Sequence, residues 1–355
     1  LWHWPVYTLM RWTTGLDTFT QQIIAVVLSF LCAMLSYHVI ENLTRNHNTI
    51  KMLPAIAKVG GGITVVALSC AMVWQMYALR PALSQSVTAD KYQWQALEHE
   101  VRDIDPTNIE RWQGRSVFVV GNSHTGAYST LLNEVKHRYG VKVHKFQVME
   151  CPIVHLLHKQ YETEHCNKVI ENLLHFFYAH GKPGDVIFFA SLRTHRIVDQ
   201  WVRFGPEYVS VISHSPQTLE NIKTAQQQAR PLLEKLNELG FNVLIDEPKP
   251  VFDTVPYRCS DWFNHQHPIC GATTISKDFL DKVSQPVRDS IATLEQDYSH
   301  VYVWQPMNSL CSDDSCSVMQ DGNTMFFDGD HLSGYGNRVL LPSFTQTLAN
   351  IWHDN

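Results

Sequence analysis

Two short segments of the chain carry residue types that could form a catalytic centre. The segment GNSH places Ser123 directly after an apolar run, and the segment DGDH, near the end of the chain, places Asp328 and Asp330 before His331. A serine hydroxyl becomes a nucleophile when a base accepts its proton, and a histidine base needs an acid to hold its tautomer. We therefore expect Ser123, His331 and Asp328 to form a Ser-His-Asp triad.

Each segment also has a plainer interpretation. Ser123 alone could be the N-cap of the helix that follows it, and the two aspartates could form a solvated acidic turn before a helix capped by Ser333. The two segments together favour catalysis, because both lie where a strand meets a helix. On this interpretation Asp330 is an acid at the start of the last helix and lies outside the triad.

Strands and helices alternate from about residue 84 onward. A short apolar run at residues 116–121 is predicted as a buried strand, and the alternation predicts further strands at 141–148, 185–191, 241–248 and 300–306. Helical spacing is found at residues 124–140, 167–181, 219–240, 277–297 and 335–352. This alternation predicts an α/β fold with a parallel sheet covered on both faces. Active sites of such sheets lie beyond the carboxyl ends of the strands, where Ser123 is expected.

Two apolar stretches precede this alternating region. Residues 22–40 and 59–79 contain no Asp, Glu, Lys or Arg, and each would be roughly 30 Å long as a helix, enough to span a bilayer core. Buried helices of a soluble domain are the alternative. The loop between the stretches carries Arg45, Lys51 and Lys58. The positive-inside rule places that loop in the cytoplasm and the following domain across the membrane.

Cysteine usage supports the same topology. Cys32 and Cys70 fall inside the apolar stretches, and the other six form close pairs in sequence: Cys151 with Cys166, Cys259 with Cys270, and Cys311 with Cys316. No C-x-x-C knuckle is present, so we expect no metal site. Disulfides in an oxidising compartment fit best, with nearest-neighbour pairing inferred from spacing alone. A net charge of −6 argues against a nucleic-acid partner.

The motifs resemble a known family. GNSH and DGDHLS are similar to the first and last blocks of the SGNH hydrolases, with Asn122 in place of the usual aspartate. LWHWP at the start and YHVIENLTR at 37–45 resemble the last helices of the acyltransferase-3 membrane family. The chain as a whole resembles the C-terminal part of a fused acyltransferase-3 and SGNH protein. This implies a flavodoxin-like three-layer sandwich with a five-stranded parallel sheet, preceded by two transmembrane helices.

The resemblance also implies boundaries and a location. Residues 1–48 would be the C-terminal remnant of the acyltransferase-3 membrane domain, residues 49–83 a linker and transmembrane helix, and residues 84–355 the SGNH domain. The chain would lie in the bacterial inner membrane with its SGNH domain in the periplasm.

The function implied is O-acetylation of a cell-envelope polysaccharide. Ser123 would carry the acetyl group as an ester and pass it to a glycan hydroxyl. The chain itself would bind no cofactor, since the acetyl group would come from acetyl-CoA through the upstream membrane domain. A carbohydrate acetyl esterase of the same family and a non-catalytic glycan-binding module are the alternatives.

The oxyanion donors depart from the family pattern. The family supplies the nucleophile's main-chain N–H, a glycine after the second strand and an asparagine after the third. Here VMECPIV contains no glycine and ASLRTHR contains no asparagine. We expect the N–H of Ser123 and the guanidinium of Arg193 to serve, with a main-chain N–H near Cys151 as the alternative.

Other polar groups receive weaker assignments. Trp262 and Asn264, in the segment CSDWFNHQHPIC, could stack on and hydrogen-bond a sugar, although a loop pinned by a disulfide explains them as well. His155 and His158 are expected to be polar surface residues.

Overall fold

A five-stranded parallel sheet is the framework of the larger of two units in the computed structural model, which describes residues 1–98, 101–105 and 109–353. This unit comprises Asp90–Tyr257 and Ile269–Asn355. Its sheet contains β1 (Ser116–Gly121), β2 (Lys142–Gln147), β3 (Val186–Ala190), β4 (Asn242–Asp246) and β6 (Val301–Trp304). The order β2-β1-β3-β4-β6, with every pair parallel, is the flavodoxin-like arrangement. The predicted fold class is confirmed.

Burial explains why these segments form strands. Every residue of β1 and β3 is buried, as expected for central strands covered on both faces. No residue of the edge strand β2 is buried, and its exposed side chains are Lys142, Lys145 and Gln147. Charged side chains on an edge strand discourage pairing with another chain.

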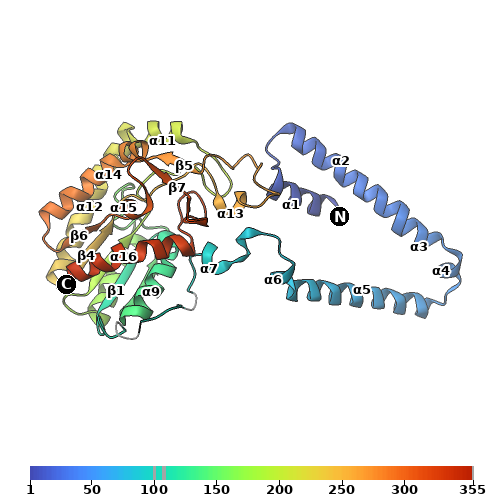
Figure 1. Ribbon diagram of the computed structural model, residues 1–355, viewed down its shortest axis with the longest axis horizontal. Helices are drawn as coiled ribbons and strands as arrows, with labels where there is room; N and C mark the ends of the chain where they lie inside the picture. Colours follow the sequence, from blue (N-terminus) through green and yellow to red (C-terminus); the bar gives the residue numbers. More distant parts are fainter. Residues whose placement is uncertain (99–100, 106–108, 354–355) are drawn as a thin grey trace. The chain divides into compact units, whose positions relative to one another are not determined.

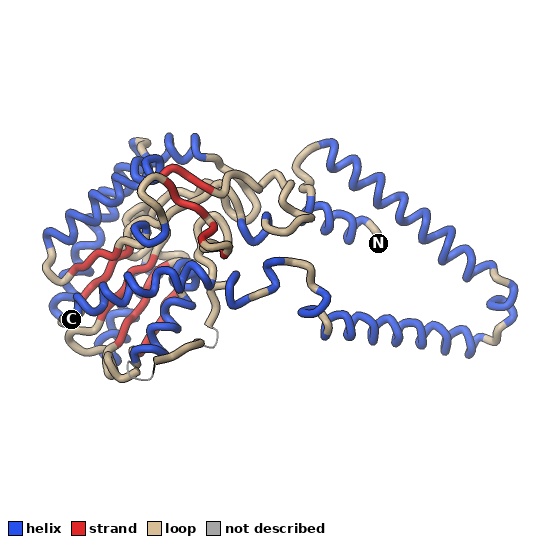
Figure 2. The backbone as a smooth tube through the Cα atoms, viewed as in Figure 1, coloured by secondary structure: helices blue, strands red, loops and turns tan. Residues whose placement is uncertain are grey.

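Helices cover both faces of the sheet (Figure 1, Figure 2). On one face, α9 (Ser129–Tyr139) and α16 (Gly334–Ile351) pack against Val117 and Val119 of β1. On the other face, α10 (Glu164–His180), α12 (Pro216–Glu238) and α14 (Lys277–Asp297) pack against Phe118 and Val120. Alternate side chains of one strand therefore enter two separate cores.

The remaining elements of this unit are short. The helices are α7 (Lys91–Trp94), α8 (His124–Ala127), α11 (Pro206–Ser213), α13 (Pro256–Cys259) and α15 (Met307–Leu310). The end of α13, from Arg258, belongs to the first unit. Two antiparallel pairs are added by β5 (Thr274–Ser276) with β7 (Ser315–Ser317), and by β8 (Met319–Gln320) with β9 (Asn323–Thr324). The chain turns into α8 directly after β1, and this turn positions Ser123 at the carboxyl end of the central strands.

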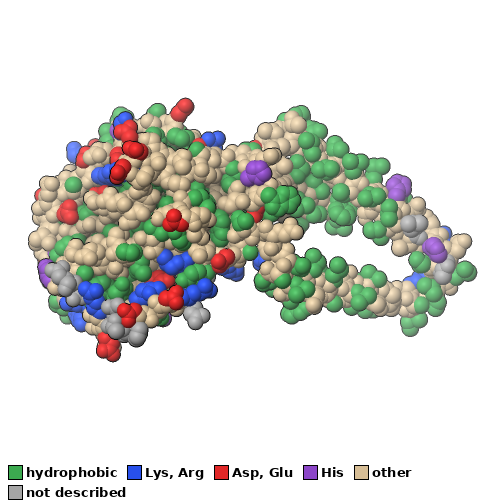
Figure 3. Space-filling view, in the orientation of Figure 1, with side chains coloured by type: hydrophobic (Ala, Val, Ile, Leu, Met, Phe, Trp, Pro, Cys, Tyr) green, Lys and Arg blue, Asp and Glu red, His purple; other side chains and the backbone are tan. Residues whose placement is uncertain are grey.

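The first unit comprises Leu1–Ala89 and Arg258–Pro268. Its helices are α1 (His3–Thr13), α2 (Phe19–Ser36) continued by η1 (Tyr37–Glu41) and α3 (Asn42–Asn46), α4 (Asn48–Met52), α5 (Ala55–Ala78) and α6 (Arg80–Leu83), followed by the 3₁₀ turn η2 (Val87–Ala89). By length and composition, Phe19–Asn46 and Ala55–Ala78 could each cross a membrane. Figure 3 shows apolar side chains covering both helices.

The segment Arg258–Pro268 belongs with the first unit through specific contacts. The Arg258 guanidinium lies 4.8 Å from the centre of the Trp12 ring, and Asp261 accepts hydrogen bonds from Ser86 and Val87. The first unit thus ends after Ala89 and includes this segment, and the domain boundaries expected from the sequence stay a prediction.

The close approach of β1 and β3 generates a stability prediction. A Cβ on Gly121 would lie 1.7 Å from the Ala190 carbonyl oxygen, so Gly121→Ala must push two paired strands apart. We expect it to lower the free energy of unfolding by more than about 2 kcal/mol, measured by denaturant unfolding of the purified chain in detergent. Gly126→Ala is the matched control, because nothing lies within 4 Å of its Cβ position. A Gly121→Ala chain as stable as the control would contradict this account.

Candidate active site

Ser123, His331 and Asp328 come together at the carboxyl end of the sheet. Ser123 precedes α8, and the other two lie on the loop before α16. The Ser123 Oγ lies 2.8 Å from His331 Nε2, and His331 Nδ1 lies 2.9 Å and 3.0 Å from the two carboxylate oxygens of Asp328. Asp328 Oδ1 also accepts the main-chain N–H of His331, which holds acid and imidazole in one turn. The arrangement has the geometry of a nucleophile, base and orienting acid.

The charge environment favours the protonated form of His331. Burial alone would lower the pKa of this imidazole, but the negative charge of Asp330 and the hydrogen bond and charge of Asp328 more than offset it, so the pKa lies above the ordinary histidine value. In the neutral ring, the proton on Nδ1 is held by Asp328. Nε2 is then left to accept the proton of the Ser123 hydroxyl.

Asp330 is not the solvated helix-start acid that the sequence suggested. Its side chain is buried, and its Oδ2 accepts hydrogen bonds from His124 Nε2 at 3.1 Å and from Arg196 Nε at 3.0 Å. Its Oδ1 lies 3.5 Å from His331 Nδ1. A buried carboxylate needs partners of this kind to offset its lost hydration. Asp330 is therefore part of the site.

A second buried histidine lies against the first. The His124 ring stacks on the His331 ring, with centres 4.6 Å apart and planes 11° from parallel. Burial, followed by the positive charge of Lys249, brings the pKa of His124 well below its ordinary value, so this ring is neutral at neutral pH. Lys249 Nζ lies 2.9 Å from His124 Nδ1. Since the ammonium can only donate, Nδ1 accepts and Nε2–H donates to Asp330.

Sequence reasoning missed His124, Lys249 and the burial of Asp330. His124 could have been noticed, since it directly follows the serine in GNSH. Lys249 carries no local signal, because a lysine after a strand is ordinarily solvated. Its burial at 2% exposure follows from contacts with distant parts of the chain.

Arg193 does not fit the oxyanion role expected from the sequence. Its guanidinium is fully buried and donates to Asp246 Oδ1 at 3.0 Å and to the carbonyl oxygens of Val154, His155 and Phe189. These bonds tie the loop after β2 to β3 and β4. The loop needs such support, because Val154 has a φ of +46°, which is unfavourable for a β-branched residue.

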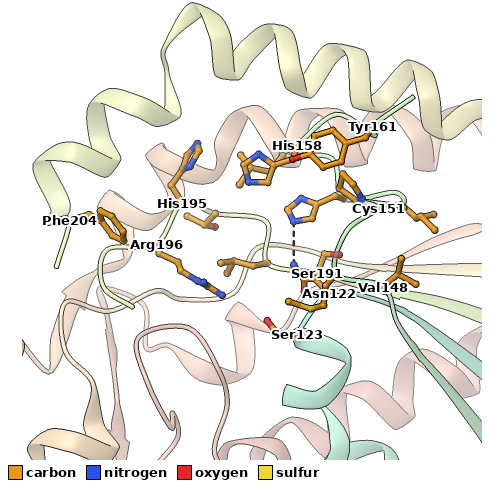
Figure 4. Close-up of a pocket in the computed structure, with 18 of the residues that line it drawn as sticks. Asn122, Ser123, Val148, Cys151, His158, Tyr161, Ser191, His195, Arg196 and Phe204 are labelled. Carbon is orange, nitrogen blue, oxygen red and sulfur yellow. Dashed lines mark hydrogen bonds between the residues drawn. The ribbon is translucent and has the colours of Figure 1, made fainter. Parts of the chain in front are cut away.

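A cavity of about 420 Å³ opens beside Ser123 (Figure 4). Its lining includes Asn122, Ser123, His155, His158, Tyr161, His195, Arg196, Phe204 and Tyr208. His155 is buried and lines this cavity, so its assignment to the polar surface is wrong.

The histidines of the cavity have lowered pKa values. Burial, followed by charge repulsion from His158, lowers the pKa of His195 to about 4, and burial also lowers the pKa of His155 and His158. These imidazoles are neutral at neutral pH.

A smaller cavity of about 200 Å³ lies against the other side of the triad. It is lined by Arg196, Asp199, Gln200, Trp201, Asp328, Asp330 and His331. Arg196 lines both cavities. The triad is therefore accessible from two sides.

The residues expected to bind sugar belong to the first unit. Asn264 is buried, and its side-chain oxygen accepts the main-chain N–H of Asp261, which closes its own loop. Trp262 is exposed and contacts Phe263 edge to face. Their role in substrate binding stays a prediction.

Two of the expected disulfides are present with the pairing predicted from the sequence. Cys151 is bonded to Cys166, and Cys311 to Cys316. Cys259 and Cys270 are also disulfide-bonded, whereas Cys32 and Cys70 are free. The Cys151–Cys166 bond ties the loop bordering the large cavity to α10.

One cluster has the residue types of a metal site. Ligand atoms of His124, Asp330 and His331 lie within 4.8 Å of one another. Two cations, Lys249 and Arg196, contact this cluster, and its polar atoms bond one another. A hydrogen-bonded network accounts for these groups better than a cation site would.

Comparison with known proteins identifies the family. Residues 88–346 match the family described as the SGNH domain fused to AT3 domains, and the chain belongs to this family. No curated protein matches the chain.

Among solved structures, the chain is similar to the periplasmic domain of a lipopolysaccharide acetyltransferase from Salmonella ser. Paratyphi A. The identity is 11%, the match covers 67% of this chain and 85% of that chain, and the TM-score is 0.39. It is also similar to a GDSL-like lipase from Bacteroides thetaiotaomicron, with 12% identity, 78% and 97% coverage, and a TM-score of 0.32. These values are too low to support an inference about activity.

The electrostatics of His331 can be tested by titration. We expect NMR of histidine-labelled chain in detergent to give His331 a pKa above 6.5, assigned by loss of its signal in His331→Gln. Asp330→Asn should lower this pKa. The negative charge of Asp330 stabilises the imidazolium, and the substitution removes that charge. Asp313→Asn, at an exposed acid, is the control and should leave it in place. An upward shift in Asp330→Asn would contradict the assigned environment.

Proposed function

We propose that this chain transfers an acetyl group through Ser123 to a hydroxyl of a cell-envelope polysaccharide. The observation that carries the proposal is the hydrogen-bonded series Ser123–His331–Asp328 opening on a cavity. Membership of a family fused to acyltransferase-3 domains supports transfer over simple hydrolysis. Such a fusion implies an upstream membrane domain, from which the acetyl group would come.

The geometry supports a two-step mechanism. Ser123 Oγ attacks the acetyl carbonyl carbon while its proton moves to His331 Nε2, and the carbonyl electron pair moves onto oxygen. Collapse of this tetrahedral anion expels the donor's oxygen, which takes the proton from His331. A glycan hydroxyl then attacks the acetyl-Ser123 ester while its proton moves to His331 Nε2. Collapse of this second tetrahedral anion breaks the bond to Ser123 Oγ, which takes the proton back from His331. Water in place of the glycan would give the esterase reaction.

The location proposed is extracytoplasmic. Disulfides persist in oxidising compartments, and two helices of the first unit have the length and composition to cross a membrane. The acetyl-CoA pool is cytoplasmic, so the donor would have to cross through the upstream domain. This chain's contribution is the triad, the cavity and the acceptor contacts.

Loss of the nucleophile tests the activity. In cells producing the full-length protein, Ser123→Ala should remove polysaccharide acetylation, and turnover of an activated acetyl ester by the purified protein should fall on the order of 10⁴-fold or more. His331→Ala should cost about as much. The control Ser299→Ala, at an exposed serine, should retain activity. Acetylation that persists without Ser123 would contradict the proposal, and ester hydrolysis without any glycan acetylation would favour the esterase.

Topology is tested separately. A reporter active only in the periplasm should work when fused after residue 90 and fail when fused near residue 48, because the basic loop between the apolar helices is expected to stay in the cytoplasm. The reverse pattern would invert the orientation and remove Ser123 from extracytoplasmic glycan.

A further inference from the structure

The site described so far provides one oxyanion donor and needs another. The main-chain N–H of Ser123 donates to no acceptor among the described residues, so it is available to the acetyl oxygen. The family's glycine and asparagine are absent, and Arg193 is bound by four buried oxygens. A second donor can be supplied by a side chain that reaches the cavity beside Ser123, or by a main-chain N–H near Cys151.

Arg196 is the side chain that meets this requirement. It lies on the loop after β3, and Figure 4 shows it extending toward Ser123. It lines both cavities. Among the described residues that line either cavity, it is the one with a permanent positive charge. Its side chain is 37% exposed, so a substrate in the cavity can contact it.

The position of Arg196 is held by a buried network. Arg196 Nε donates to Asp330 Oδ2 at 3.0 Å, and His124 Nε2 lies 3.1 Å from the same oxygen. Lys249 in turn donates to His124, and all three supporting side chains are 2% exposed or less. Asp330 therefore has little freedom to move, and it fixes the near end of the guanidinium. Among described residues, no acceptor is bonded to either Nη group of Arg196.

We propose that the Nη groups of Arg196, together with the N–H of Ser123, form the oxyanion hole of this enzyme. The proposal rests on the proposed function. When Ser123 Oγ bonds to the acetyl carbon, the carbonyl oxygen gains a full negative charge, and two fixed N–H donors stabilise that charge more than they stabilise the neutral carbonyl. Asp330 and His124 are positioning residues, since they act by holding Arg196.

The other polar groups of the cavity fit this role less well. The Asn122 amide nitrogen faces His155 Nε2 at 3.3 Å, and its oxygen accepts the N–H of His124. His155 and His195 are held neutral, and each carries a buried ring nitrogen without a described partner. A fixed cation beside the nucleophile provides stronger stabilisation of an oxyanion than these groups.

The test is kinetic, on the full chain with an activated acetyl ester. Arg196→Gln should lower kcat on the order of 100-fold, with KM changed less than about threefold, because the lost interaction exists in the transition state. Arg196→Lys should recover part of the loss, since one cationic donor remains. The control is Arg203→Gln. Arg203 is paired with Asp253 and lines neither cavity.

A transition-state analogue separates this role from a structural one. An alkyl boronic acid adds to a serine hydroxyl and forms a tetrahedral anion, so its affinity should fall in Arg196→Gln by about the same factor as kcat/KM. Added guanidinium ion should restore part of the turnover of Arg196→Ala. A rise in KM with kcat and boronate affinity unchanged would assign Arg196 to ground-state binding of an anionic acyl donor or acceptor, and overturn the proposal.

The two proposals fail in different ways. Wild-type chain that neither turns over the ester nor binds the boronate contradicts the proposed function, and the Arg196 assignment with it. Wild-type chain that does both, while Arg196→Gln matches Arg203→Gln in kcat and boronate affinity, contradicts the Arg196 assignment alone.

Discussion

Two aspartates held out of water beside one imidazole are the constraint on which this site depends. Asp328 and Asp330 are both buried, and His331 Nδ1 lies within 3.5 Å of each. Two desolvated carboxylates so close together are costly unless each has its own donors. Asp328 is satisfied by His331 and by main-chain N–H groups of its own turn. Asp330 depends on His124 at the start of α8 and on Arg196 of the loop after β3.

Asp246, farther from Ser123, is a buried carboxylate that likewise needs its own donors. Asp246, at the end of β4, accepts from Arg193 and Tyr128 and lies 3.9 Å from Lys249 Nζ. Opposite charges therefore alternate through the buried layer beneath the site. Removing one member leaves an unpaired charge, whose burial is more costly than the pair is favourable. The layer is rigid for that reason, and it can orient groups at the cavity wall.

The loops around the large cavity are held by covalent and polar ties. The Cys151–Cys166 bond fixes one end of the loop after β2, and Arg193 binds the carbonyl oxygens of its strained middle. A cavity walled by loops keeps its shape when their backbone is anchored in this way. The arginine expected to bind the oxyanion thus stabilises the cavity wall, and Arg196, three residues later, faces the cavity.

The alternating elements and the residues Ser123, His331 and Asp328 could be named before any contact was known. Apolar runs predicted the central strands β1 and β3, because central parallel strands are apolar along their whole length. The polar edge strand β2 was predicted from its place in the alternation of strands and helices. The pairing of GNSH with DGDH followed from the chemical needs of a serine nucleophile. The folded structure was needed to see that Asp330 is buried, that Arg193 is occupied by other acceptors and that Arg196 reaches the cavity. Burial and hydrogen-bond partners of an ionic group depend on loops distant in sequence, and no local pattern records which loops will meet.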